Sequence, residues 1–221
     1  ALSVKDVAFA EKDLDEFEIG GAVTWSPPSQ LDLVVDYAVY LAADTAGSGR
    51  VLIDNSSVVG TNLAQVDPHT ALSTFTNVVV YIRSGHSEQS IPSSSPLISD
   101  AASSTSAVAF TDKDLDHEEV AGTVVWNPPA ELSQVTHYVV YLFGDILTQR
   151  SVAVGTNEAN VPIDTNLSSI LTQFAVYTRS SLVEQSTPTI FVISDASSTV
   201  SGITFPDQDL DLNQFGGTIH W

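Results

Sequence analysis

The chain has 221 residues with 27 acidic and 7 basic side chains, so its formal net charge is −20. This acidic balance argues against nucleic acid or an anionic membrane surface as partner, because phosphate groups would be repelled. The absence of cysteine rules out disulfides and thiolate metal sites. A hydrophobic content of 43% is too high for a disordered acidic tail. No long apolar run is present, so we expect no membrane insertion.

The first element along the chain is a stretch that occurs three times. It reads "FAEKDLDEFEIGGAVTW" at Phe9–Trp25, "FTDKDLDHEEVAGTVVW" at Phe110–Trp126 and "FPDQDLDLNQFGGTIHW" at Phe205–Trp221. Later segments also recur, among them 25–41 at 126–142. Self-similarity at a fixed period indicates a repeat architecture. We therefore predict repeat 1 at 1–100, repeat 2 at 101–195, and the first strands of an incomplete third repeat at 196–221.

The third copy stops at Trp221, after only its first predicted strands. Half a sandwich cannot bury its core, so we expect this sequence to be a window on a longer array. The alternative expectation is that the third segment completes a neighbouring chain.

Within each repeat the hydrophobic residues alternate with a period of two, which is typical of β-strands. In 122–126 ("GTVVW") Val124 and Trp126 share one face, and in 138–142 ("YVVYL") Tyr138 and Leu142 do the same. Clusters of Gly, Pro, Asn, Asp and Ser separate these runs. About seven short strands per repeat predict an all-β chain of tandem antiparallel β-sandwiches.

These residues resemble the fibronectin type III family. The resemblance lies in Trp followed by Pro-Pro and then Tyr-x-Val, which reads "WSPP" and "YAV" at 25–28 and 37–39 and "WNPP" and "YVV" at 126–129 and 138–140. It implies an immunoglobulin-like sandwich and says little about function. In the slot where that family usually carries a corner tyrosine, this chain has Val78 and Phe174, and Tyr81 and Tyr177 are expected on the opposite face. The chain is also similar to long tandem-repeat proteins predicted in protists such as dinoflagellates.

Large aromatic residues recur in the strongest strand patterns and are predicted to anchor the cores. Replacing Trp25 or Trp126 with Ala is expected to cost about 3–5 kcal/mol. The predicted structural core residues are Trp25, Trp126, Trp221, Tyr37 and Tyr138.

Alternating acidic residues open each repeat and recur near each repeat end. On a strand they would share one face, and in a loop they would resemble the first ligands of a calcium loop. The EF-hand pattern fails, because His117 and Thr123 stand where Gly and Glu are required. We predict calcium at the junctions between repeats, with a solvated acidic edge as the alternative. The predicted ligands are Asp112, Asp114, Asp116, Asp100, Glu119, Asp207, Asp209, Asp211, Asp195, Asp13 and Asp15.

No known catalytic motif is present, so we expect no enzyme activity and no cofactor other than calcium. The five histidines are interpreted as surface residues. Two sequons predict glycosylation at Asn55 and Asn166, and together with the Ser/Thr-rich, Lys-poor composition they favour an extracellular or cell-surface location.

The predicted function is structural: a segment of a long extracellular filament, stalk or surface coat whose partners are neighbouring repeats or copies of itself. One alternative is a cell-surface adhesion or ligand-binding module that uses loops at one end of each sandwich. Another is a spacer beside an enzyme domain.

Overall fold

The computed structural model describes residues 2–143, 150–167 and 172–221, and no helix occurs in this part of the chain. The strands of repeat 1 are β1 (Lys5–Glu11), β2 (Glu18–Ser26), β3 (Asp36–Ala42), β4 (Val51–Val58), β5 (Leu63–Ala71), β6 (Asn77–Arg83) and β7 (Ser93–Ser94). The strands of repeat 2 are β8 (Ser106–Phe110), β9 (Glu119–Asn127), β10 (His137–Phe143), β11 (Arg150–Ala153), β12 (Glu158–Asn166), β13 (Gln173–Arg179) and β14 (Thr189–Val192).

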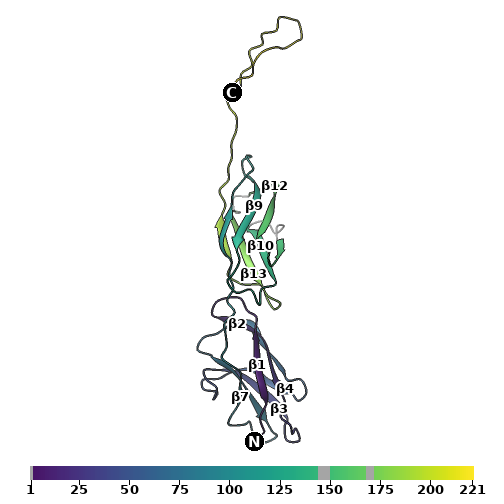
Figure 1. Cartoon of the computed structure of the whole chain (residues 1–221), viewed down its shortest axis with the longest axis vertical. Helices are drawn as coiled ribbons and strands as arrows, with labels where there is room; N and C mark the ends of the chain where they lie inside the picture. Colours follow the sequence, from purple (N-terminus) through teal and green to yellow (C-terminus); the bar gives the residue numbers. More distant parts are fainter. Residues whose placement is uncertain (1, 144–149, 168–171) are drawn as a thin grey trace.

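Each repeat is built from two antiparallel sheets. Repeat 1 has a three-stranded sheet in the order β1-β2-β5 and a four-stranded sheet in the order β4-β3-β6-β7. Repeat 2 has the corresponding sheets, β12-β9-β8 and β11-β10-β13-β14. The predicted all-β sandwich architecture is therefore confirmed. The two sandwiches follow one another end to end along the long axis of the molecule (Figure 1).

The side chains that the period-two alternation predicts to face inward lie between the two sheets of each repeat. Trp25 and Tyr37 meet edge to face in repeat 1, with ring centroids 5.4 Å apart, and both are buried. Trp126 and Tyr138 form the same pair in repeat 2 at 5.3 Å. These four residues are core anchors, as predicted.

The residues of β6 and β13 lie on the faces of the four-stranded sheets that the sequence predicts. Val78 and Phe174 lie in the two cores. Tyr81 instead packs with Tyr40 on the outer face of its sheet, where the guanidinium of Arg50 lies 4.2 Å from the Tyr81 ring centroid.

The prediction for Trp221 as a core residue is wrong in this structure, because its side chain is 79% exposed. Residues 196–221 extend away from repeat 2 and turn back on themselves, with a bridge between Thr204 and His220 (Figure 1). A hairpin without a second sheet offers no interior in which an indole ring could be buried. Among the described residues, no helix is long and apolar enough to cross a membrane.

Candidate functional site at the junction between repeats

The alternating acidic residues of each copy lie in a loop, except Glu11, which is the last residue of β1. We call residues 12–17, 111–118 and 206–215 the acidic loops. In the first of them the Asp13 amide donates to Glu11 Oε1 at 2.7 Å and the Asp15 amide donates to Asp13 Oδ1 at 3.0 Å. Short acidic side chains commonly bond the backbone two residues further on in this way. The other two acidic loops contain equivalent bonds.

These local bonds direct Leu14, the residue between the two aspartates, into repeat 2. Leu14 is fully buried and belongs to the hydrophobic core of repeat 2, together with Val135 and Trp126. Its carbonyl accepts hydrogen bonds from the Ser103 amide at 3.0 Å and from Gln185 Nε2 at 3.3 Å. Repeat 1 therefore donates a core residue to its neighbour.

The carboxylate of Asp15 fastens the same loop to the segment before β14. It accepts hydrogen bonds from the Ser186 amide at 2.6 Å, and from the amide and hydroxyl of Thr187 at 3.0 and 2.5 Å. Asp15 is 2% exposed, so a charge is removed from water here and must be matched by donors. Three donors from one turn of repeat 2 supply that match.

A third set of contacts ties the connection between repeats to the acidic loop. Glu11 Oε2 accepts from the Ala101 amide at 2.9 Å, and Asp100 Oδ2 accepts from the Phe17 amide at 2.8 Å. Burial raises the pKa of Glu11 to about 7, because its desolvation outweighs the amide hydrogen bonds that favour the charged form. The junction therefore contains a carboxyl group that titrates near neutral pH.

The same contacts recur where repeat 2 meets the third segment. The Ala196 amide donates to Asp112 Oδ2 at 3.0 Å, and the Glu118 amide donates to Asp195 Oδ2 at 3.0 Å. The Ser198 amide donates to the carbonyl of Leu115 at 2.9 Å, as Ser103 does to Leu14. Leu115 itself is 58% exposed, since no folded sandwich covers it.

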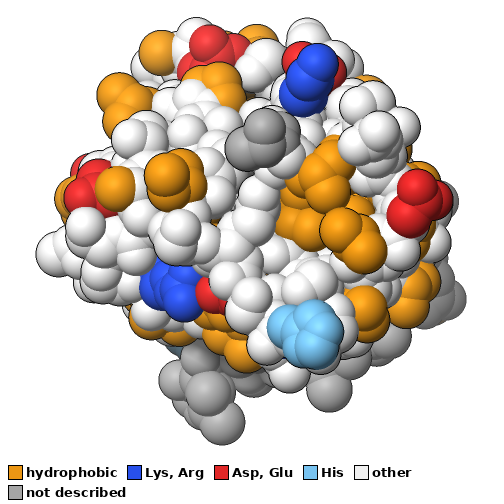
Figure 2. All heavy atoms as spheres, turned by 90° about the horizontal axis from the view of Figure 1, so that it is seen from below, with side chains coloured by type: hydrophobic (Ala, Val, Ile, Leu, Met, Phe, Trp, Pro, Cys, Tyr) orange, Lys and Arg blue, Asp and Glu red, His pale blue; other side chains and the backbone are white. Residues whose placement is uncertain are grey.

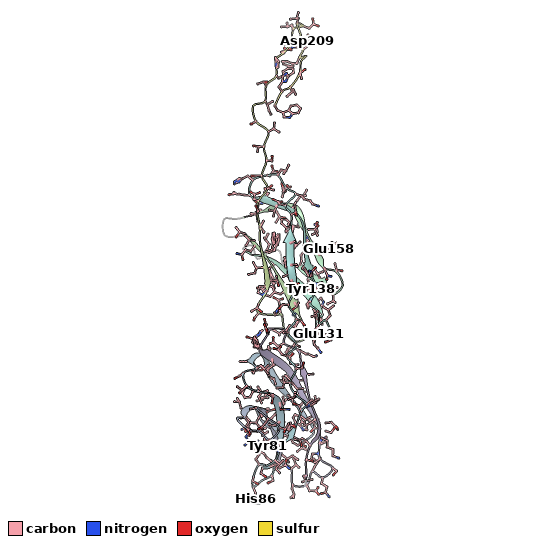
Figure 3. All side chains as sticks on the ribbon, turned by 60° about the vertical axis from the view of Figure 1, so that its left-hand side comes forward. Tyr81, His86, Glu131, Tyr138, Glu158 and Asp209 are labelled. Carbon is pink, nitrogen blue, oxygen red and sulfur yellow. The ribbon has the colours of Figure 1, made fainter. Side chains whose placement is uncertain are left out.

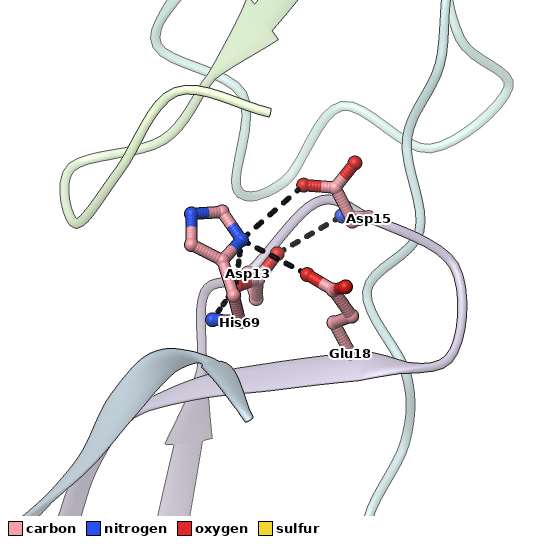
Figure 4. A group of neighbouring side chains, drawn as sticks. All are labelled: Asp13, Asp15, Glu18 and His69. Atoms are coloured by element: carbon pink, nitrogen blue, oxygen red, sulfur yellow. Dashed lines mark hydrogen bonds and ion pairs between the residues drawn. The ribbon is translucent and has the colours of Figure 1, made fainter. Parts of the chain in front are cut away.

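Two groups of side chains could hold a metal ion, each with ligand atoms within 4.8 Å of one another. The first contains Asp13, Asp15, Glu18 and His69, with His69 Nδ1 2.9 Å from Glu18 Oε2 (Figure 4). The second contains the equivalent residues of repeat 2, and there a fourth carboxylate replaces the imidazole. Its members are Asp114, Asp116, Glu119 and Asp164.

The structure brings together only part of the predicted ligand set. Asp13, Asp15, Asp114, Asp116 and Glu119 belong to these two groups. Among the described residues the other predicted ligands belong to neither group. Asp100, Asp112 and Asp195 accept amides at the junctions. Asp207 and Asp209 accept amides within the third acidic loop, which also contains Asp211.

Sequence reasoning missed His69 and Asp164. Both stand at the same place in β5 and β12, with φ of 60° and 57°, and both donate a backbone amide to the middle aspartate of the adjacent acidic loop. Their side chains differ, so only their position in the repeat could have revealed them. Each directly precedes a threonine and follows a proline by one or two positions. Glu119 has a raised pKa, because of its desolvation and the nearby carboxylates of Asp164 and Asp114.

The other predicted residues lie on the surface. Asn55 and Asn166 are exposed, and Ser168 of the second sequon lies outside the described residues. Arg83 pairs with Asp36 of its own repeat, with Nε and Oδ1 2.6 Å apart.

No family model matches the chain, and no curated protein matches it. Similar solved structures include a two fibronectin type-III domain segment from chicken tenascin, with 15% identity, a TM-score of 0.34 and coverage of 86% of this chain and 98% of that one. The central fibronectin-III array of RIM-binding protein has 17% identity, a TM-score of 0.29 and coverage of 95% and 73%. The FN1–FN3 domains of chicken CNTN1 have 13% identity, a TM-score of 0.33 and coverage of 93% and 71%. The fold of each repeat is an antiparallel β-sandwich of one three-stranded and one four-stranded sheet.

Proposed function

We propose that the chain is a non-catalytic structural segment of an extracellular filament, stalk or surface coat in which each repeat is locked to the next. The observation that carries this proposal is the burial of Leu14 in the core of repeat 2. Flexibly linked domains behave as independent beads, whereas a shared core residue couples their orientation and their stability. A rigid junction is the property that a load-bearing or spacing element requires.

The proposal is tested by measuring the rigidity of the junction in the full chain. The chain lacks native cysteine, so dyes can be attached at His86→Cys and Glu158→Cys, which are exposed sites in repeats 1 and 2 (Figure 3). Single-molecule energy transfer is expected to give one narrow distance distribution. Leu14→Asp is expected to broaden it, because an aspartate cannot occupy the apolar core position.

Leu115→Asp is the matched control, because it makes the same change at the equivalent exposed position. It is expected to leave the distribution narrow. A distribution that is as broad in the parent chain as in the Leu14→Asp variant would contradict a rigid array and favour a flexible spacer or an adhesion module.

We also propose that calcium binds the acidic loop of repeat 2. What supports this is the group of four carboxylates Asp114, Asp116, Glu119 and Asp164, which repel one another unless a cation neutralises them. Calcium prefers six to eight oxygens, so waters or a neighbouring molecule must supply the remaining ligands.

Millimolar calcium is expected to raise the Tm of repeat 2 relative to chelator, since binding to the folded state alone stabilises it. Asp164→His places the residue of repeat 1 at this position and is expected to abolish the shift. Equal melting curves of the parent chain in calcium and in chelator would refute the site.

A further inference from the structure

The end of repeat 1 that lies farthest from repeat 2 carries an open hollow of about 240 Å³. Hydrophobic side chains gather around a depression on this end of the molecule (Figure 2). Half of its lining residues are apolar, namely Leu2, Leu33, Val34 and Ile82, and the polar half includes Ser84, Ser87, Glu88 and Gln89. Leu33 is 71% exposed, and Ile91, two residues after Gln89, is 78% exposed. Large apolar side chains that gather in the solvent mark a surface whose burial against a partner is favourable.

This hollow is the counterpart of the place that Leu14 fills in repeat 2. Alignment of the repeats pairs Val34 with Val135, Ile82 with Thr178 and Gln89 with Gln185. In repeat 2, Val135 shares the core with Leu14, and Gln185 donates to the Leu14 carbonyl at 3.3 Å. We call these two places the sockets of repeats 1 and 2.

The polar part of the socket of repeat 2 also has a counterpart in repeat 1. The amides of Ser186 and Thr187 donate to Asp15 at the filled junction. The equivalent amides in repeat 1 belong to Ser90 and Ile91, and neither has a hydrogen-bond partner among the described residues. The socket of repeat 1 thus offers a hollow with apolar walls at Leu33, Val34 and Ile82 beside two free amide donors, which is the arrangement that an Asp-Leu-Asp loop uses.

One acidic loop of this chain is free to enter such a socket. Leu210 is 100% exposed at the tip of the third acidic loop. The loop has the internal bonds of the docked one, with the Asp209 amide 3.0 Å from Asp207 Oδ1 and the Asp211 amide 2.8 Å from Asp209 Oδ1. Asp209 lies at the opposite end of the molecule from His86, which is near the socket (Figure 3). The loop and the socket are therefore placed for head-to-tail contact between two copies.

The acidic loop of repeat 2 is a poorer occupant. The Leu115 carbonyl already accepts the Ser198 amide at 2.9 Å, which is the bond that belongs to a following repeat. In addition, the chain leaves repeat 2 beside this loop and would obstruct a second copy.

We propose that the socket of repeat 1 receives the Asp209–Asp211 loop of a second copy of this chain, with Leu210 in the hollow and Asp211 accepting the amides of Ser90 and Ile91. The contact is heterologous, so it propagates into an open head-to-tail filament and does not close as a symmetric dimer. The inference rests on the proposed function, and head-to-tail docking is the way in which copies add to the array. The net charge of −20 opposes association, and salt weakens that repulsion.

The test is sedimentation velocity of the full chain over a wide concentration range at moderate salt. The parent chain is expected to associate with increasing concentration. Leu210→Asp in the loop and Leu33→Asp at the socket rim are each expected to weaken association more than tenfold. Both positions are exposed, so neither change disturbs a core. Val51→Asp, at an exposed position away from the loop and the socket, is the control and is expected to associate like the parent.

Mixing the two variants makes the test specific to a head-to-tail contact. Leu210→Asp retains the socket and Leu33→Asp retains the loop, so the mixture is expected to form a 1:1 complex that neither variant forms with itself. A parent chain that stays monomeric would overturn the inference, as would association that survives Leu33→Asp or that is lost in Leu115→Asp instead. A monomer with a narrow energy-transfer distribution would overturn the docking alone and leave the proposed rigid array standing.

Discussion

Replacing Leu14 with Ala tests whether the repeats are coupled through a shared core. The side chain is fully buried among the core residues of repeat 2, although it belongs to repeat 1. A buried Leu→Ala change costs about 2–5 kcal/mol, from lost transfer free energy and the cavity that remains. The free energy of unfolding of repeat 2 should fall by this amount, because its unfolding exposes Leu14 even while repeat 1 stays folded.

The expected change in melting temperature is large. For a domain of this size, 1 kcal/mol shifts Tm by about 4–8 °C, so the lower estimate of 2 kcal/mol predicts a loss of about 8 °C or more for repeat 2. Differential scanning calorimetry measures the transitions, and hydrogen exchange read by mass spectrometry assigns them to repeats. Slow exchange in β13 should be lost first, while β6 should keep its protection.

Leu115→Ala provides the matched control, because it removes the same atoms from the equivalent loop at a position that is 58% exposed. Its effect should stay within about 0.5 kcal/mol. If the two variants lost the same Tm, or if Leu14→Ala destabilised only repeat 1, the reasoning that repeat 1 completes the core of repeat 2 would be refuted.

Three further predictions concern single residues. Burial raises the pKa of Glu11 from 4.5 to about 7, so the folded chain holds this proton more tightly than the unfolded chain. The contribution of this group to stability should therefore decline as pH rises from 4.5 to 7. Glu11→Gln should flatten that part of a curve of Tm against pH. Gly122 has φ of 152° and a Cβ there would lie 2.7 Å from the Thr111 carbonyl oxygen, so Gly122→Ala should cost more than the about 1–3 kcal/mol of backbone strain alone. Gly155→Ala, with φ of 96° and open space, measures that strain by itself in chemical denaturation. Trp126→Ala should cost about 3–5 kcal/mol. It should make repeat 2 unfold at lower urea than repeat 1, as measured by hydrogen exchange in β13 and in β6.

The fold could be predicted from the sequence because its determinants are local and are repeated. The alternation around Trp25 and Trp126 selected the strands, and the recurrence of the same pattern showed which hydrophobic positions face inward. Trp221 was predicted from the same pattern and is exposed here, because burial depends on an opposing sheet that a strand pattern does not supply. Pattern specifies which face of a strand is apolar, whereas tertiary structure decides whether that face is covered.

The junction could be predicted only in part, because its contacts join residues far apart in the chain. The aspartates were predicted as calcium ligands, yet the leucine between them also recurs in all three copies, as Leu14, Leu115 and Leu210. An apolar residue kept within a polar loop is the signal that was available. Gln185 donates to the Leu14 carbonyl and Ser186 donates to Asp15, each from 171 positions away, and no periodicity connects these residues to the loop.

The acidic loop explains why a charged segment can hold a hydrophobic junction together. A bare leucine on a flexible loop would lose conformational entropy on docking, which opposes its burial. Here the amides of Asp13 and Asp15 are already bound within the loop, so its shape is set before contact. The buried carboxylate of Asp15 then accepts three hydrogen bonds that a shifted or rotated neighbour could not supply together. Leu14 therefore supplies much of the stability of the junction, and Asp15 fixes its register, since an unmatched buried charge penalises every other arrangement.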